Sequence, residues 1–92
     1  MTVAQMSRNR YGIAINLRLA GELARRQGRL TEAIRLLNES IEYYRILGNI
    51  PGIALVQATL GWAMLDSGNP HMAQALLAES LACFSKLNAR IG

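Results

Sequence analysis

Apolar side chains recur at helical spacing in two segments of the chain. The first stripe consists of Leu30, Ala33, Ile34, Leu37, Ile41 and Tyr44. The second stripe consists of Ala73, Leu76, Leu77, Leu81 and Phe84. Residues at this spacing share one face of an α-helix, and that face packs against a neighbouring element. The pattern predicts amphipathic helices over about residues 30–47 and 70–89, and no segment alternates as a β-strand does.

Glycine and proline divide the chain between further helices. Gly28 and Gly68 each follow a segment that we expect to be helical, about residues 12–27 and 52–67. A glycine at such a position commonly ends a helix in the left-handed conformation. Residues 48–51 hold glycine, asparagine and proline, which predicts the end of one helix and the start of the next.

The sequence repeats itself with a shift of 40 residues. The identical pairs include Gly12 with Gly52, Ala14 with Ala54, Gly21 with Gly61, Leu37 with Leu77 and Ser40 with Ser80. This repetition predicts two helix-turn-helix units, about residues 12–51 and 52–92, in one domain of residues 1–92. The four main helices are antiparallel, and each pair must stack on the other to bury its apolar side. Residues 2–11 are predicted as the tail of a preceding helix or as an extension of the first.

The small residues of the two units resemble the skeleton of tetratricopeptide repeats. They are Gly21, Gly28, Ala33 and Ser40 in the first unit, and Gly61, Gly68, Ala73 and Ser80 in the second. The resemblance covers Tyr11 to Gly92 and implies an all-α fold, an α-solenoid of two repeats. A unit of 40 residues is longer than the common one of about 34. It is similar to the arrays of large bacterial transcriptional regulators, so a fragment of such an array is one alternative, and HEAT-type units are another.

The resemblance also implies a concave face, lined by the first helix of each unit, that binds an extended or helical peptide. Carried over residue by residue, this face holds Ile15, Arg18, Glu22, Arg25, Arg26, Leu55, Ala58, Trp62, Leu65 and Asp66. Arginine and tryptophan dominate binding hot spots, so we expect a protein-interaction scaffold. The alternative is structural: Trp62 fills the core, and Glu22 pairs with Arg18 and Arg26.

Composition adds a second candidate surface. The chain is 51% hydrophobic and 17% charged, and a domain of 92 residues cannot bury every apolar side chain. The last helix carries more apolar residues than one buried face needs: Met72, Leu76, Leu81, Phe84 and Leu87. We therefore expect a homo-oligomer, and a self-assembling structural module is the alternative function.

The sequence offers little for catalysis or metal binding. His71 and Cys83 are the single residues of their types, and they lie about 18 Å apart along one predicted helix. We expect no enzyme activity, no cofactor and no metal. The lone cysteine fits a reducing cytoplasm.

Charge is concentrated in the first half of the chain. Residues 1–46 hold eight arginines against four glutamates, whereas residues 47–92 are neutral overall. A basic half can attract acidic peptides or nucleic acid, but there is no basic run or DNA-reading motif. We therefore expect a protein or peptide partner and not nucleic acid. Residues 46–65 are uncharged, but the turn-forming residues within them argue against a membrane span.

Overall fold

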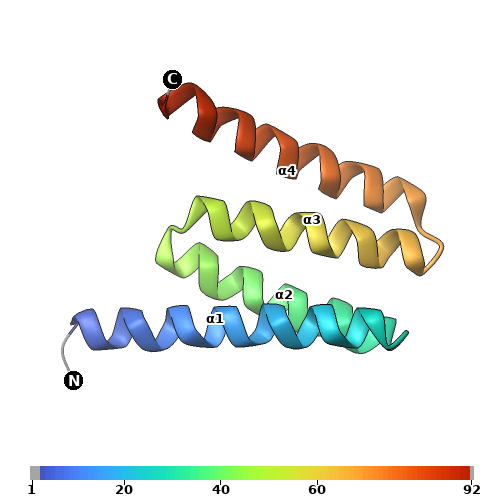
Figure 1. Cartoon of the computed structure of the whole chain (residues 1–92), viewed down its shortest axis with the longest axis horizontal. Helices are drawn as coiled ribbons and strands as arrows, with labels where there is room; N and C mark the ends of the chain where they lie inside the picture. The colour runs from blue at the N-terminus through green and yellow to red at the C-terminus, as the bar shows by residue number, and fades with distance from the viewer. Residues whose placement is uncertain (1–2, 92) are drawn as a thin grey trace.

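In the part of the chain that the structure describes, four α-helices follow one another and lie antiparallel in sequence order (Figure 1). The computed structural model describes the backbone of residues 3–91 and the side chains of residues 9–87. The helices are α1 (Val3–Arg26), α2 (Leu30–Leu47), α3 (Ile50–Asp66) and α4 (Pro70–Ile91). This arrangement confirms the predicted all-α helical repeat for the part of the chain described. Residues 1, 2 and 92 of the predicted domain lie outside it.

Helix α1 is longer than the repeat predicted. It begins at Val3, so the residues before Gly12 extend the first helix and are not the tail of a separate one. Tyr11, in this extension, lies edge-on to Tyr44 of α2, with the ring centroids 6.2 Å apart. This aromatic contact joins the first part of α1 to the end of α2.

The helix ends have the predicted turn chemistry. Three glycines with positive φ follow the helices: Gly28, Gly48 and Gly68. At the end of α2, Gly48 takes the left-handed conformation that glycine adopts without steric cost. Asn49 then caps α3, because its side-chain oxygen accepts a hydrogen bond of 2.9 Å from the backbone N–H of Gly52.

Glycine allows the two helices of each pair to approach closely. A Cβ atom on Gly21 would lie 2.8 Å from the side chain of Leu37, and one on Gly61 would lie 2.9 Å from Leu77. Such distances are shorter than van der Waals contact, so a larger residue at either position would displace the opposite leucine.

Buried serines make a second pair of matched contacts. The hydroxyl of Ser40 donates to the carbonyl of Ala14 over 2.7 Å, and that of Ser80 donates to the carbonyl of Ala54 over 2.8 Å. Each serine therefore joins the second helix of its pair to the first without leaving a buried polar group unsatisfied.

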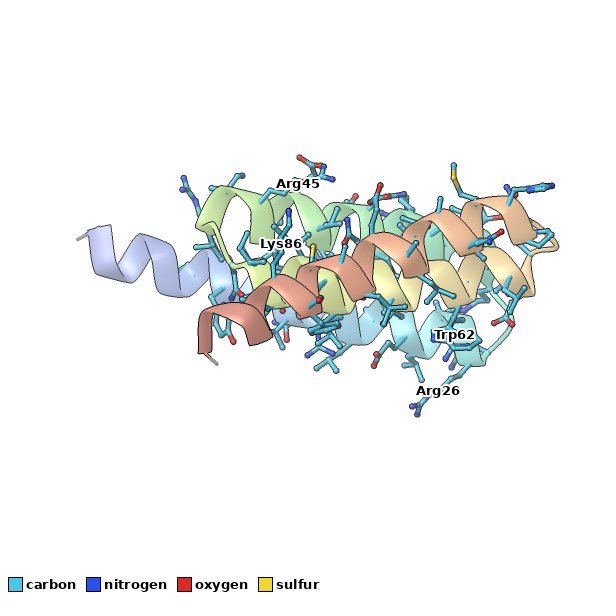
Figure 2. All side chains as sticks on the ribbon, turned by 90° about the horizontal axis from the view of Figure 1, so that it is seen from above. Arg26, Arg45, Trp62 and Lys86 are labelled. Atoms are coloured by element: carbon cyan, nitrogen blue, oxygen red, sulfur yellow. The ribbon has the colours of Figure 1, made fainter. Side chains whose placement is uncertain are left out.

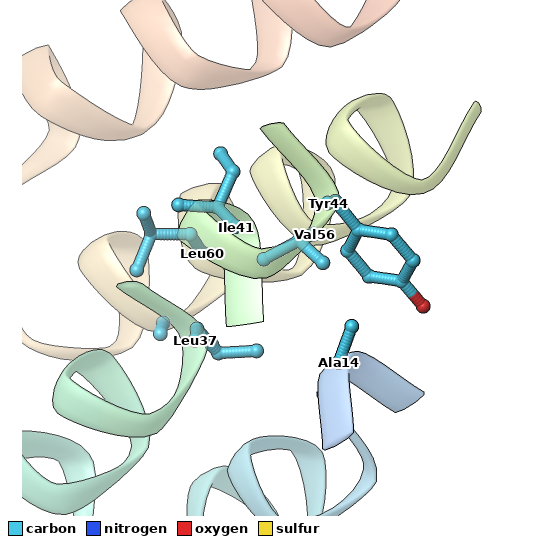
Figure 3. Packing of buried hydrophobic residues seen from close by; sticks show 7 residues of the cluster. Ala14, Leu37, Ile41, Tyr44, Val56 and Leu60 are labelled. Carbon is cyan, nitrogen blue, oxygen red and sulfur yellow. The ribbon is translucent and has the colours of Figure 1, made fainter. Parts of the chain in front are cut away.

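The main hydrophobic core lies where the first three helices meet (Figure 3). It contains Ala14 of α1, Leu37, Ile41 and Tyr44 of α2, and Val56, Leu60 and Ala63 of α3. Helix α4 packs only against α3 among the described helices. The apolar stripe predicted for the last helix is consequently buried in part, with Ala73 inside and Leu81 and Phe84 exposed.

Candidate protein-binding face

The first helices of the two pairs lie side by side and form one face of the molecule. Figure 2 shows Arg26 of α1 and Trp62 of α3 pointing to the same side, whereas Arg45 of α2 points to the opposite side. We call this surface the α1/α3 face. Arg26 and Trp62 are two of the residues that the sequence predicted for a concave binding face.

Two polar contacts tie α1 to α3 across this face. Arg25 forms a salt bridge of 3.1 Å with Asp66, and the carboxylate of Glu22 accepts a hydrogen bond of 3.5 Å from the hydroxyl of Thr59. Both contacts join predicted face residues or their neighbours. The sequence did not predict that Arg25 pairs with Asp66, because the two residues lie on different helices.

The charges on the α1/α3 face do not all have partners. Arg18 lies 3.9 Å from Glu22, one turn further along the same helix. Arg26 forms no ion pair among the described residues, so the predicted pairing of Glu22 with Arg26 is wrong. The face therefore keeps a positive balance at its α1 edge.

Trp62 is exposed on this face. Half of its surface, 50%, is accessible, so the structural alternative in which Trp62 fills the core is wrong. Leu55 and Leu65 of the same helix are also exposed, and Ala58 is half-buried between them. An exposed tryptophan among exposed leucines is an apolar surface with no cover from the described chain.

A small hollow opens at the other end of the same face. It has a volume of about 190 Å³. It is lined by residues of α1, α2, α3 and the turn before α3, which are Tyr11, Ile15, Arg18, Tyr44, Asn49, Pro51, Gly52 and Leu55. Ile15, Arg18 and Leu55 were predicted for this face. The sequence did not assign the other lining residues to this face, and Tyr11 lies in the part of α1 that precedes the predicted repeat.

The residues predicted for self-association lie along α4. Met72, Leu81 and Phe84 are exposed, whereas Leu76 and Leu87 are half-buried, and Leu76 packs against the core. A second hollow, of about 380 Å³, is lined by Leu65, Pro70, Ala73, Gln74, Leu77, Ala78 and Leu81. The depression therefore lies between α3 and α4, beside the exposed Leu81.

The polar residues near α4 form a structural contact. The side-chain amide of the buried Gln57 donates to the carboxylate of Glu79 over 3.1 Å, so Glu79 holds α3 and α4 together. His71 is exposed, and Cys83 is half-buried and free. Among the described residues, no three histidine, cysteine, aspartate or glutamate side chains gather as metal ligands would.

Paired antiparallel helices with matched glycine and serine contacts define an α-helical repeat protein. A family model described as tetratricopeptide repeat matches residues 6–86. The chain therefore belongs to the tetratricopeptide repeat family, whose domains are generally protein-interaction modules. No curated protein and no solved structure matches it significantly. None of the described helices has the length and apolar character needed to cross a membrane.

Proposed function

We propose that the chain is a cytoplasmic scaffold module that binds a peptide or a partner helix on its α1/α3 face. The half-exposed Trp62 carries this proposal, because tryptophan is one of the side chains enriched at the centre of protein interfaces and at binding hot spots. The proposed role requires no catalytic group.

The hollow on the α1/α3 face suits a side chain and not a whole small molecule. Its volume of about 190 Å³ is below the range of about 300–1,000 Å³ that small-molecule sites occupy. Leu55 and Ile15 line it, and Arg18 stands at its wall. It would accept one apolar side chain of a partner, while a second would pack on Trp62.

The charges favour a partner with acidic residues. Arg26 has no ion pair among the described residues, and Arg18 has only a long contact with Glu22. A carboxylate of the partner can pair with either guanidinium. The predicted ligand is therefore an amphipathic peptide with apolar anchors and neighbouring acidic residues.

Selection of displayed peptides against the folded chain, followed by titration of the selected peptide, tests this proposal. We expect Trp62→Ala to weaken binding about tenfold or more, because a hot-spot truncation costs more than about 1.4 kcal/mol. Arg26→Ala should weaken binding less, and its effect should diminish as salt is added.

Arg45→Ala is the matched control, because Arg45 lies on the opposite face (Figure 2) and pairs with Glu42 over 2.8 Å. It should leave binding unchanged. If the selected peptides bind the Trp62 and Arg26 variants as tightly as the parent chain, the α1/α3 face is not the binding site.

A further inference from the structure

The contact between α2 and α3 shows how one helix pair covers the next in this protein. Leu37, Ile41 and Tyr44 project from α2 into the core, where they meet Val56 and Leu60 of α3. The ring of Tyr44 lies directly over Gly52, where a Cβ atom would overlap it. Large residues of α2 thus fit against a helix with a glycine at the contact.

Helix α4 presents a similar set of large residues that no described helix covers. Forty residues after Leu37, Ile41 and Tyr44 stand Leu77, Leu81 and Phe84, which we call the α4 end face. Leu81 is 70% exposed, against 5% for Ile41, and Phe84 is 39% exposed, against 3% for Tyr44. The hollow of about 380 Å³ is lined by Leu77 and Leu81, so it is the depression that a neighbouring helix would fill.

Helix α1 presents the corresponding positions at the opposite end of the molecule, with the glycine kept and the other residues changed. Gly12, Asn16, Ala20 and Leu23, which we call the α1 end face, stand forty residues before Gly52, Val56, Leu60 and Ala63. A Cβ atom on Gly12 would meet nothing within 4 Å. No contact within the described chain explains a glycine in this helix interior, where it costs about 1 kcal/mol relative to alanine.

We propose that the α4 end face of one copy of this chain packs against the α1 end face of a second copy. Phe84 of one copy would lie over Gly12 of the next, as Tyr44 lies over Gly52 within a copy. Leu23, which is 54% exposed, would enter the apolar depression beside Leu81. The contact uses two different surfaces, so it is head-to-tail and leaves a free end of each kind for further copies.

The α4 end face repeats the large apolar residues of α2, and the α1 end face repeats the glycine of α3, with Asn16 and Ala20 in place of Val56 and Leu60. Because this one chain carries both a face of large residues and a face with a glycine at the matching position, a second copy is the occupant we propose. The proposal is distinct from binding at the α1/α3 face, because neither Phe84 nor Gly12 belongs to that face; the two surfaces share only Leu65, which lines the depression. A single helix-to-helix contact is small compared with a standard stable interface, so the association should be weak and concentration-dependent.

Sedimentation equilibrium of the chain over about 5–500 μM tests the assembly, a range set by the weak affinity expected of a small interface. We expect the mean mass to rise through that of a dimer as concentration increases. Leu81→Glu blocks the α4 end face, and Leu23→Glu blocks the α1 end face. Because the contact needs one face of each kind, each variant alone should remain a monomer. Both positions are exposed in the single chain, so neither change is expected to unfold it.

Mixing the two glutamate variants gives the decisive result. Each variant keeps the end that the other lacks, so the mixture should form a dimer and stop there. A wild-type chain that stays monomeric, a Leu23→Glu variant that still dimerises, or a mixture that stays monomeric would overturn the proposal. A Leu23→Glu variant that still dimerises indicates a symmetric dimer through α4. A wild-type chain that stays monomeric indicates that a different protein covers the α4 end face.

Gly12→Ala keeps the test valid if a glutamate variant loses helicity. An added Cβ should strengthen the isolated helix and weaken the assembly, because it would meet the ring of Phe84. If Gly12 had only a structural role, the change to alanine would not raise the stability of the single chain and weaken its self-association at the same time.

Discussion

At the residue scale, Gly52 and Gly12 show how the same residue has different neighbours in the two units. Gly52 lies beneath the ring of Tyr44, whereas the space beside Gly12 is open within the described chain. A methyl group added at Gly52 must displace the core side chain of Tyr44. The same methyl group added at Gly12 displaces no described atom of the same copy.

Gly52→Ala is therefore expected to lower the free energy of unfolding by about 1–2 kcal/mol, because overpacking costs more than the helix propensity of alanine returns. Gly12→Ala is the matched control and should raise the free energy of unfolding by about 0.5–1 kcal/mol. Urea denaturation followed by circular dichroism at low protein concentration measures both. Equal effects of the two changes would contradict the contact between Gly52 and Tyr44.

Trp62 shows what sequence reasoning could and could not supply for a single side chain. The family resemblance assigned it to a binding face, but its spacing along the helix allowed a core position equally well. The structure leaves it half exposed because no described helix lies over that side of α3. Whether a partner covers it remains a prediction.

At the element scale, α2 and α4 have similar sequences in different surroundings. α2 lies between α1 and α3, whereas α4 packs on α3 alone among the described helices. Leu37 of α2 is fully buried, and its counterpart Leu77 is half-buried beside the depression on α4. The same side chain therefore stabilises the two helices to different extents.

We expect Leu37→Ala to lower the free energy of unfolding by about 2–5 kcal/mol, as large-to-small changes in a closed core do. Leu77→Ala should cost about half as much, because part of the leucine is already in contact with water. Denaturant titration at a concentration where the chain is a monomer measures both. Similar losses would show that α4 is covered on both sides even in the single chain.

The helix boundaries were the most predictable part of these elements. Gly48 and Asn49 end α2 and cap α3 through local backbone geometry, which depends on neighbours in sequence. The sequence allows two interpretations of residues 3–11, because Gly12 follows them and the 40-residue shift aligns them with the end of one helix and the turn after it. Tyr11 reaches Tyr44 only once the helices are folded together.

At the scale of the whole molecule, the two end faces determine how stability responds to concentration. A contact made only between folded copies stabilises the folded state by mass action. The proposed stack should therefore raise the melting temperature as the protein concentration increases.

The expected rise is a few degrees between about 5 and 500 μM, since about 1 kcal/mol shifts the midpoint of a domain of this size by about 4–8 °C. Thermal melts followed by circular dichroism measure it. The Leu81→Glu variant should melt at the same temperature across the range. A melting temperature that rises equally for this variant would show that the α4 end face is not responsible.

The sequence by itself determined the helices, their order and the residues that share each helical face. The helix ends depend on local turn chemistry, as at Gly28, and the shared faces depend on helical spacing, as at Leu37. Both are interactions between residues that are close in the sequence. Only the tertiary structure decided which of two equivalent residues is covered, as with Ile41 and Leu81, and that Arg25 would pair with Asp66 of another helix. Periodicity identifies a face but does not reveal what lies against it, because burial depends on neighbours in space.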